Sequence, residues 1–116
     1  MAIVIRRGST PEIKCYIPED IDMSSIVNIW LYLTQNEHGK DIVKIDKLYD
    51  DITKTPEEHL LSVTLSQDDT LNLKVGTALI QIRLLMQDGT CLPSSEETVR
   101  VLNVYKGGVM TNGEGD

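Results

Sequence analysis

The residues of this sequence that could do acid–base or metal chemistry are two histidines, two cysteines and several neighbouring acids. His38 lies beside Gly39 in a polar stretch, and His59 ends an acidic run. Neither histidine has a nucleophile in a recognisable catalytic context, so the sequence predicts no triad. The cysteines form no CxxC pair, and the histidines are not spaced to complete a zinc site. We therefore expect no catalytic residue, no bound metal and no cofactor.

The neighbouring acids fit exposed or capping positions better than catalytic ones. Asp50-Asp51 and Glu57-Glu58 lie in one polar segment, whereas a catalytic carboxylate pair needs a buried member with a raised pKa. Asp68-Asp69 lacks the alternating oxygen ligands and the glycine of a calcium loop. Ser66, three residues before Asp69, instead predicts a capping arrangement at the start of a short helical turn.

Cys15 and Cys91 are expected to be reduced thiols that act as small apolar fillers, and a disulfide between the first and last strands is the alternative. The first eight residues do not resemble a secretory signal. In such a signal basic residues precede a long apolar run, but here Arg6 and Arg7 follow a short one.

Length and charge narrow the class of protein. The chain has 116 residues and a formal net charge of −7, which fits one globular domain and argues against a nucleic-acid-binding module. No segment approaches the roughly 20 apolar residues that span a bilayer, so no membrane partner is expected.

Alternation of apolar and polar residues dominates the sequence and predicts β-strands. It is clearest in residues 26–35, where Val27, Ile29, Leu31 and Leu33 share one face. Residues 78–87 alternate in the same way, and Asp88-Gly89 then predicts a tight hairpin turn. The further expected strands are residues 2–6, 12–17, 41–46, 60–65 and 98–105, with Pro93, Ser94 and Ser95 marking a bulge or an edge before the last of them.

These strands predict an all-β, antiparallel β-sandwich of about seven strands over residues 1–106, with one short helical turn at Ser66 that crosses between the sheets. Residues 50–59 are expected to form an exposed loop in which Pro56 could open a helical turn. Residues 107–116 are expected to be a flexible tail. The predicted core is built from Ile29, Leu31, Ile80, Ile82 and Leu84.

Trp30 is expected to be a core residue, because the single tryptophan of a sandwich is more often buried than exposed. Its phase opposite to Ile29 and Leu31 keeps an exposed position open.

Several stretches taken together resemble a known group of proteins. The resemblance is to small immunoglobulin-like proteins of bacteriophages and prophages of Gram-positive, mostly Clostridia-like, gut bacteria. These are similar in layout to the N-terminal domains of phage baseplate upper proteins. The likeness covers about residues 4 to 110. It is carried by Arg6–Pro11 (RRGSTP), Leu65–Leu71 (LSQDDTL), Val75-Gly76, Ile80–Arg83 (IQIR), Asp88-Gly89 and Val99–Val109.

This resemblance implies an immunoglobulin-like sandwich and a non-enzymatic virion structural or accessory protein of the head, tail or baseplate. Such a protein would be made in the bacterial cytoplasm and would act in the virion through protein–protein contacts, with other virion proteins and as a homo-oligomer. The alternative is a host-surface or carbohydrate-binding domain, which would need exposed aromatic residues on one face. The candidates for that role are Trp30, Tyr32, Tyr49 and Tyr105.

Partner contacts are expected on the N-terminal strand, at Ile3, Ile5, Arg6 and Arg7. An apolar strand at a chain end is expected to be a sheet edge that can pair with a neighbour. The two arginines would limit that pairing or meet an acidic patch on the partner. The alternative is that the strand completes the sheet of its own chain.

Overall fold

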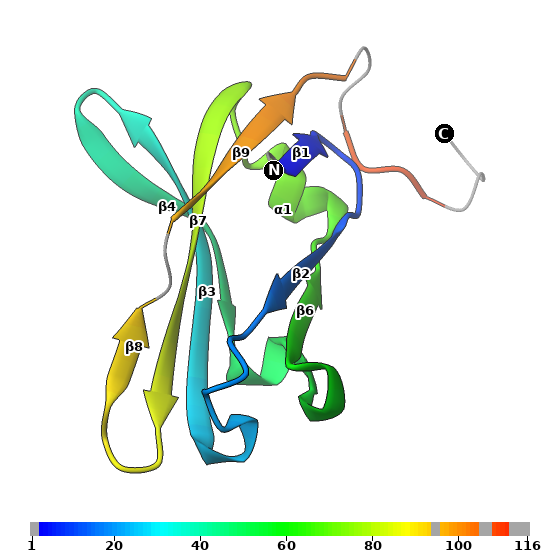
Figure 1. Cartoon of the computed structure of the whole chain (residues 1–116). Coiled ribbons are helices and arrows are strands. Elements are labelled where there is room, and N and C mark those ends of the chain that lie inside the picture. The colour runs from blue at the N-terminus through cyan, green and yellow to red at the C-terminus, as the bar shows by residue number, and fades with distance from the viewer. Residues whose placement is uncertain (1–2, 94–95, 105–107, 112–116) are drawn as a thin grey trace.

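The computed structural model of the chain describes residues 3–93, 96–104 and 108–111 and shows two β-sheets that share one core (Figure 1). This is the predicted immunoglobulin-like β-sandwich. The larger sheet has the order β1 (Ile3–Arg6), β9 (Glu97–Leu102), β7 (Gly76–Met86), β3 (Ile26–Glu37) and β4 (Lys40–Leu48), with β8 (Cys91–Pro93) also paired to β7.

The smaller sheet has three strands, and short helical turns join the strands of both sheets. Its order is β2 (Glu12–Tyr16), β6 (Leu60–Thr64) and β5 (Thr53–Thr55). The turns are η1 (Met23–Ser25), η2 (Tyr49–Asp51), η3 (Pro56–Glu58) and α1 (Gln67–Leu71).

One strand pair departs from the antiparallel prediction. β1 runs parallel to β9, with Ile3 opposite Val99 and Arg6 opposite Leu102. The chain leaves β1 for β2 in the other sheet, so β1 is not a hairpin neighbour of β9 and need not run against it. The other strand pairs of the described residues are antiparallel.

The two long central strands form the core as predicted. Ile29, Leu31 and Leu33 on β3 are fully buried, and the residues of β7 that face the same way are buried too. All five predicted core residues lie in this cluster. Burial of each such side chain is worth about 1.5–3 kcal/mol, so this double row supplies much of the driving force for folding.

Val27 is the exception on β3, and its predicted place on the core face is wrong. The register between β3 and β7 shifts between Ile26 and Asn28, which pair with Met86 and Leu85. A bulge of this kind inserts one extra residue and reverses the alternation beyond it. Ile26 is therefore buried, and Val27 is 50% exposed.

The last predicted strand, residues 98–105, is present as β9 but ends early, and the short β8, which was not predicted, precedes it. β8 pairs with residues 83–85 of β7, and β9 pairs with residues 76–80. Pro93 ends β8, as its interrupting role predicted, whereas Ser94 and Ser95 lie outside the described residues. β9 ends at Leu102, and Tyr105 lies outside the described residues.

The segment from residue 50 to residue 59 holds more structure than the predicted loop. Pro56 opens the helical turn η3 as expected. The preceding β5 was not predicted, because three residues are too few to show an alternation and the strand exists only through its pairing with β6. Lys54 on β5 lies 3.6 Å from the centre of the Tyr49 ring and donates to the Tyr49 carbonyl oxygen at 2.8 Å.

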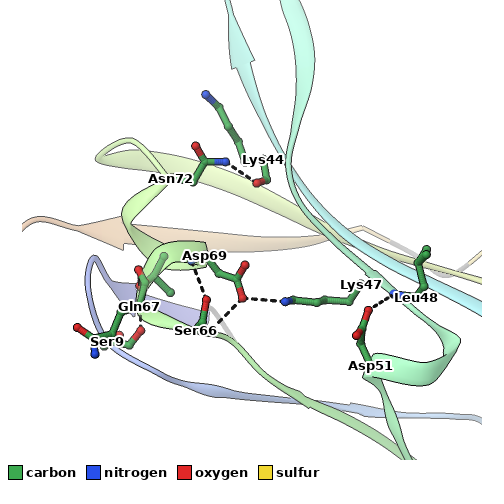
Figure 2. Close-up of polar contacts among 10 residues, drawn as sticks. Ser9, Lys44, Lys47, Leu48, Asp51, Ser66, Gln67, Asp69 and Asn72 are labelled. Atoms are coloured by element: carbon green, nitrogen blue, oxygen red, sulfur yellow. Dashed lines mark hydrogen bonds and ion pairs between the residues drawn. The ribbon is translucent and has the colours of Figure 1, made fainter. Parts of the chain in front are cut away.

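The turn α1 carries the chain from β6 to β7, and so from the smaller sheet to the larger (Figure 1). Its predicted cap is present: the Asp69 backbone N–H donates to Ser66 Oγ at 3.0 Å, and the Ser66 N–H donates to Asp69 Oδ2 at 2.8 Å (Figure 2). Lys47 on β4 forms an ion pair with the same Asp69 oxygen at 2.8 Å. The cap therefore also ties α1 to an edge strand of the larger sheet.

Part of the predicted flexible tail is held against α1. Gln67 Nε2 donates to the Met110 carbonyl oxygen at 3.1 Å, and the Met110 N–H donates to Gln67 Oε1 at 2.6 Å. Residues 112–116 lie outside the described residues.

Truncation of Leu31 to alanine should lower the free energy of unfolding by about 2–5 kcal/mol, because the side chain is fully buried. Val27→Ala should lower it by less than about 1 kcal/mol, because the bulge turns Val27 toward solvent. Urea unfolding of the two variants measures both values. Equal losses for Val27 and Leu31 would contradict the bulge.

The ion pair at Asp69 should make stability depend on acid pH. Burial raises the pKa of Asp69, but hydrogen bonds from Lys47 and from the Ser66 backbone outweigh it and hold the pKa below its usual 3.8. A carboxyl with a lowered pKa stabilises the fold above its unfolded-state pKa and loses this contribution as pH falls through the folded-state value. Asp69→Asn should therefore cost on the order of 1 kcal/mol at pH 7 and little in strong acid.

The control for this experiment is Asp68→Asn, which changes the exposed neighbouring carboxyl in the same turn. Chemical unfolding of the three proteins across acid and neutral pH gives the comparison. A pH-independent loss for Asp69→Asn, or an equal loss for Asp68→Asn, would contradict the role of the Lys47–Asp69 pair.

Candidate functional site

The outer face of the larger sheet, turned away from the core, is the candidate site. On β3 and β7 the residues that alternate with the buried rows point to this face. Trp30 lies on β3 of this face, with Leu48 of β4 on one side and Arg83 of β7 on the other.

Trp30 is 45% exposed, so its predicted place in the core is wrong. Side chains alternate between the two faces of a strand, so Trp30 points to the face opposite to that of its neighbours Ile29 and Leu31. This alternation outweighs the general tendency of tryptophan to be buried. The guanidinium carbon of Arg83 lies 5.0 Å from the centre of the Trp30 ring. This is cation–π geometry, which shields part of the ring.

A small hollow lies beside Trp30. Its volume is about 160 Å³, and its lining includes Asn28, Trp30, Arg83, Leu85 and Cys91. Arg83 Nη2 lies 3.5 Å from Cys91 Sγ and spans one side of it. Ligand pockets usually measure about 300–1,000 Å³, so this hollow has the size for an inserted side chain rather than for a free substrate.

A second opening lies between the two sheets, where β2 faces β7 and β8. This cleft measures about 450 Å³ and is lined mainly by apolar residues, with Lys14 and Glu97 as its charged groups. Cys15 of β2 is part of the lining, and burial, with the negative charge of Glu97 adding to it, raises the pKa of its thiol to about 11.

The four residues predicted to bind a partner are divided by the fold. Ile5 is 1% exposed and belongs to the core, and Ile3 lines the cleft. Arg7 donates to Asn103 Oδ1 and to the Leu71 carbonyl oxygen, each at 3.1 Å. β1 pairs with β9 of its own chain and is an edge strand of the larger sheet, as expected. Of the four residues only Arg6 is exposed, on the outer face.

The histidines and acids occupy turns. His38 and His59 both have positive φ, at the end of the β3–β4 hairpin and after η3. Asp50-Asp51 and Glu57-Glu58 are exposed as predicted, and Asp51 Oδ2 accepts the Leu48 N–H at 3.0 Å (Figure 2). Within the described part of the chain, no three His, Cys, Asp or Glu residues are grouped to hold a metal ion.

Both cysteines are free thiols. Cys15 is half-buried, as a filler would be, but Cys91 is exposed, so that interpretation is wrong for Cys91. No helix in the described ranges has the length and apolar content to cross a membrane.

Comparison with known proteins finds a similar fold and no family. The sequence matches no protein-family model and no curated protein. Among solved structures, the chain is similar to CopC from Methylosinus trichosporium OB3b, with 12% sequence identity and a TM-score of 0.51. The match covers 91% of this chain and 89% of that one. At this identity the likeness shows the β-sandwich fold alone.

The two thiols should differ sharply in reactivity. At pH 8 the raised pKa of Cys15 leaves it roughly a hundredfold less thiolate than an ordinary cysteine, and the thiolate is the reactive form. Iodoacetamide should therefore modify Cys91 first in the folded protein, and both residues at similar rates in denaturant. Peptide mass spectrometry measures the two rates. Equal labelling of Cys15 and Cys91 in the folded protein would contradict the buried position of Cys15.

Proposed function

We propose that the protein is a non-enzymatic structural or accessory component of a bacteriophage virion and that it acts through protein–protein contacts. The observation that carries the contact role is the half-exposed Trp30 on the outer sheet face, near Leu48 and Leu85, which are also exposed. Exposed apolar residues that gather on one face are typical of interaction sites.

The phage assignment rests on the sequence resemblance, and the fold gives a physical reason for several of its residues. Gly8 and Ser9 from the first stretch bond to Thr70 in the Leu65–Leu71 stretch, at 2.9 Å each. Arg7 reaches the carbonyl oxygen of Leu71. The first two stretches therefore meet at α1, where they join the two sheets. This supports a shared sandwich, on which the virion role is proposed.

Carbohydrate binding at the same face is the second candidate, and exposed Trp30 is the observation that favours it. Tyr32 points to the same face two residues along β3 and pairs with Gln81, an amide that could hydrogen-bond to a sugar. Tyr49 packs against the core and Lys54 covers its ring, so it does not add to this face.

The virion role is tested in the bacterium that encodes the protein. Induced particles are purified on a density gradient, and their proteins are identified by mass spectrometry. The protein should copurify with head or tail proteins, or, as an assembly accessory, should be captured with them from the induced cells. Its absence from both samples, in which other virion proteins are detected, would overturn the proposal.

The carbohydrate alternative is tested with Trp30, the single tryptophan of the chain. Fragments of bacterial cell-wall polysaccharide should shift its fluorescence and bind saturably, and Trp30→Ala should abolish binding in calorimetry. Binding that survives Trp30→Ala, or no binding to any fragment, would exclude a sugar site on this face.

A further inference from the structure

We infer that the outer face of the larger sheet binds the same face of a second copy of this chain, in a twofold dimer that places Arg100 opposite Asp41 of the partner subunit. The inference rests on the proposed function, which is protein–protein contact through this face, and it identifies the partner as a second copy of the chain. It follows from the apolar residues of the face, from its charges and from the register of its strands.

The apolar residues of the face are spread over the sheet from edge to edge. The five strands hold 4, 6, 11, 12 and 9 residues, and at about 3.3 Å per residue and 4.8 Å per strand they offer roughly 670 Å². Stable interfaces bury about 600–1,000 Å² on each partner, so this face has the size for one if it is covered over its whole extent. The exposed apolar residues that the strand register turns to this side are Val4, Trp30, Val43, Leu48 and Leu85.

The charges of the face favour a second copy as the occupant. The charged strand residues that point outward are three arginines, at positions 6, 83 and 100, and two aspartates, at positions 41 and 46. Their sum is +3 − 2 = +1, whereas the chain carries −7, so the rest of the molecule carries −8. Two copies repel each other over most of their surface, and on this face, which is close to neutral, the like-charge repulsion between them is weakest.

The positive and negative residues of the face lie on opposite sides of β7. Arg6 and Arg100 are on β1 and β9, whereas Asp41 and Asp46 are on β4. The order β1-β9-β7-β3-β4 places β7 in the middle. A half-turn about an axis along β7, between two facing sheets, therefore lays the arginine side of one copy over the aspartate side of the other.

Continued one outward position beyond the last β3–β7 pair, Thr34 with Leu79, the strand register brings one pair of charges to about the same height. Arg100 pairs with Thr77 on β7, one outward position beyond Leu79. Leu79 pairs with Thr34, and one outward position further on β3 is Asn36, which pairs with Asp41. Because the half-turn preserves height along the strands, Arg100 comes within about one strand spacing of Asp41 of the partner subunit, and the contact occurs twice.

The same half-turn gives the hollow beside Trp30 an occupant. It carries Trp30 of the partner subunit across β7 to the side of β8, where Leu85 and Cys91 line the hollow. A large aromatic ring in a central pocket is the usual anchor of a protein interface. The arrangement is self-complementary, because each copy offers both the ring and the hollow.

Charge reversal tests the dimer in the full-length protein. Sedimentation equilibrium across a roughly hundredfold range of concentration should give a dimer. Arg100→Asp and Asp41→Arg should each raise the dimer dissociation constant at least tenfold, because each places like charges together twice. The double variant should return it to within about threefold of the original value, because the pair is restored in reverse.

Lys14→Asp is the matched control, with the same change of charge on β2 of the smaller sheet. It should leave the dissociation constant unchanged. Circular dichroism and thermal melts check that every variant is folded. Quenching of Trp30 by acrylamide should weaken as the wild-type concentration rises, and should not change in Arg100→Asp.

Three results would overturn the inference. The first is a monomer at every concentration, and the second is a dimer whose dissociation constant changes in neither single variant. The third is a loss of affinity in the single variants that the double variant fails to restore. Different results would overturn the proposed function. A monomeric protein found in particles overturns only the dimer, and a dimer with the predicted reversals that is absent from both virion samples overturns only the virion role.

Discussion

The crossing between the two sheets at α1 is the constraint on which the sandwich depends. The polar groups that such a turn buries are shielded from water, and each of them needs a partner, while its exposed groups can add further bonds to the sheets. Thr70 is fully buried, and its hydroxyl donates to the Ser9 carbonyl oxygen and accepts the Gly8 N–H. Asn72 donates to the Lys44 carbonyl oxygen at 2.6 Å (Figure 2), and buried Gln35 bonds both polar backbone atoms of Lys74, at 2.7 and 2.9 Å. The crossing from β1 to β2, the end of β3 and the edge strand β4 are thus fastened to one turn, and this fixes how the sheets lie on each other.

Once the sheets are fixed, alternation decides which side chains remain available for contacts. The inner row of β3 is filled by Ile29, Leu31 and Leu33, so every intervening residue must point outward. Trp30 is outward for this reason. Arg83 stacks on it because the two are direct cross-strand partners. The same parity places Ile5 in the core and leaves Val4 and Arg6 outside. The exposed apolar face is therefore a consequence of how the core is built.

Signals contained within one segment predicted its structure well, and signals that depend on a partner strand did not. The Ser66 cap and the Pro56 turn are local, and the alternation of β3 and β7 is strong, so all three could be read from the sequence. The bulge at Val27 is a shift of register against β7, and β5 is defined by its pairing with β6. Neither feature produces a pattern in the sequence of its own segment. The candidate site was missed for a different reason. A general tendency of tryptophan was given more weight than the parity of Trp30, although parity was the more direct information.

The stretch Ile80–Arg83 contains both residues that the core explains and residues that it does not. Ile80 and Ile82 face the core and explain half of that stretch by packing. Gln81 and Arg83 face outward, opposite Tyr32 and Trp30, where packing of the core cannot explain them. An arginine laid flat on an exposed tryptophan costs side-chain entropy and shields an apolar ring only in part. The partner that we propose for this face would remove both the ring and the arginine stem from water. The outward half of the stretch therefore lies on the face for which we propose a contact role, and the inward half belongs to the core of the sandwich.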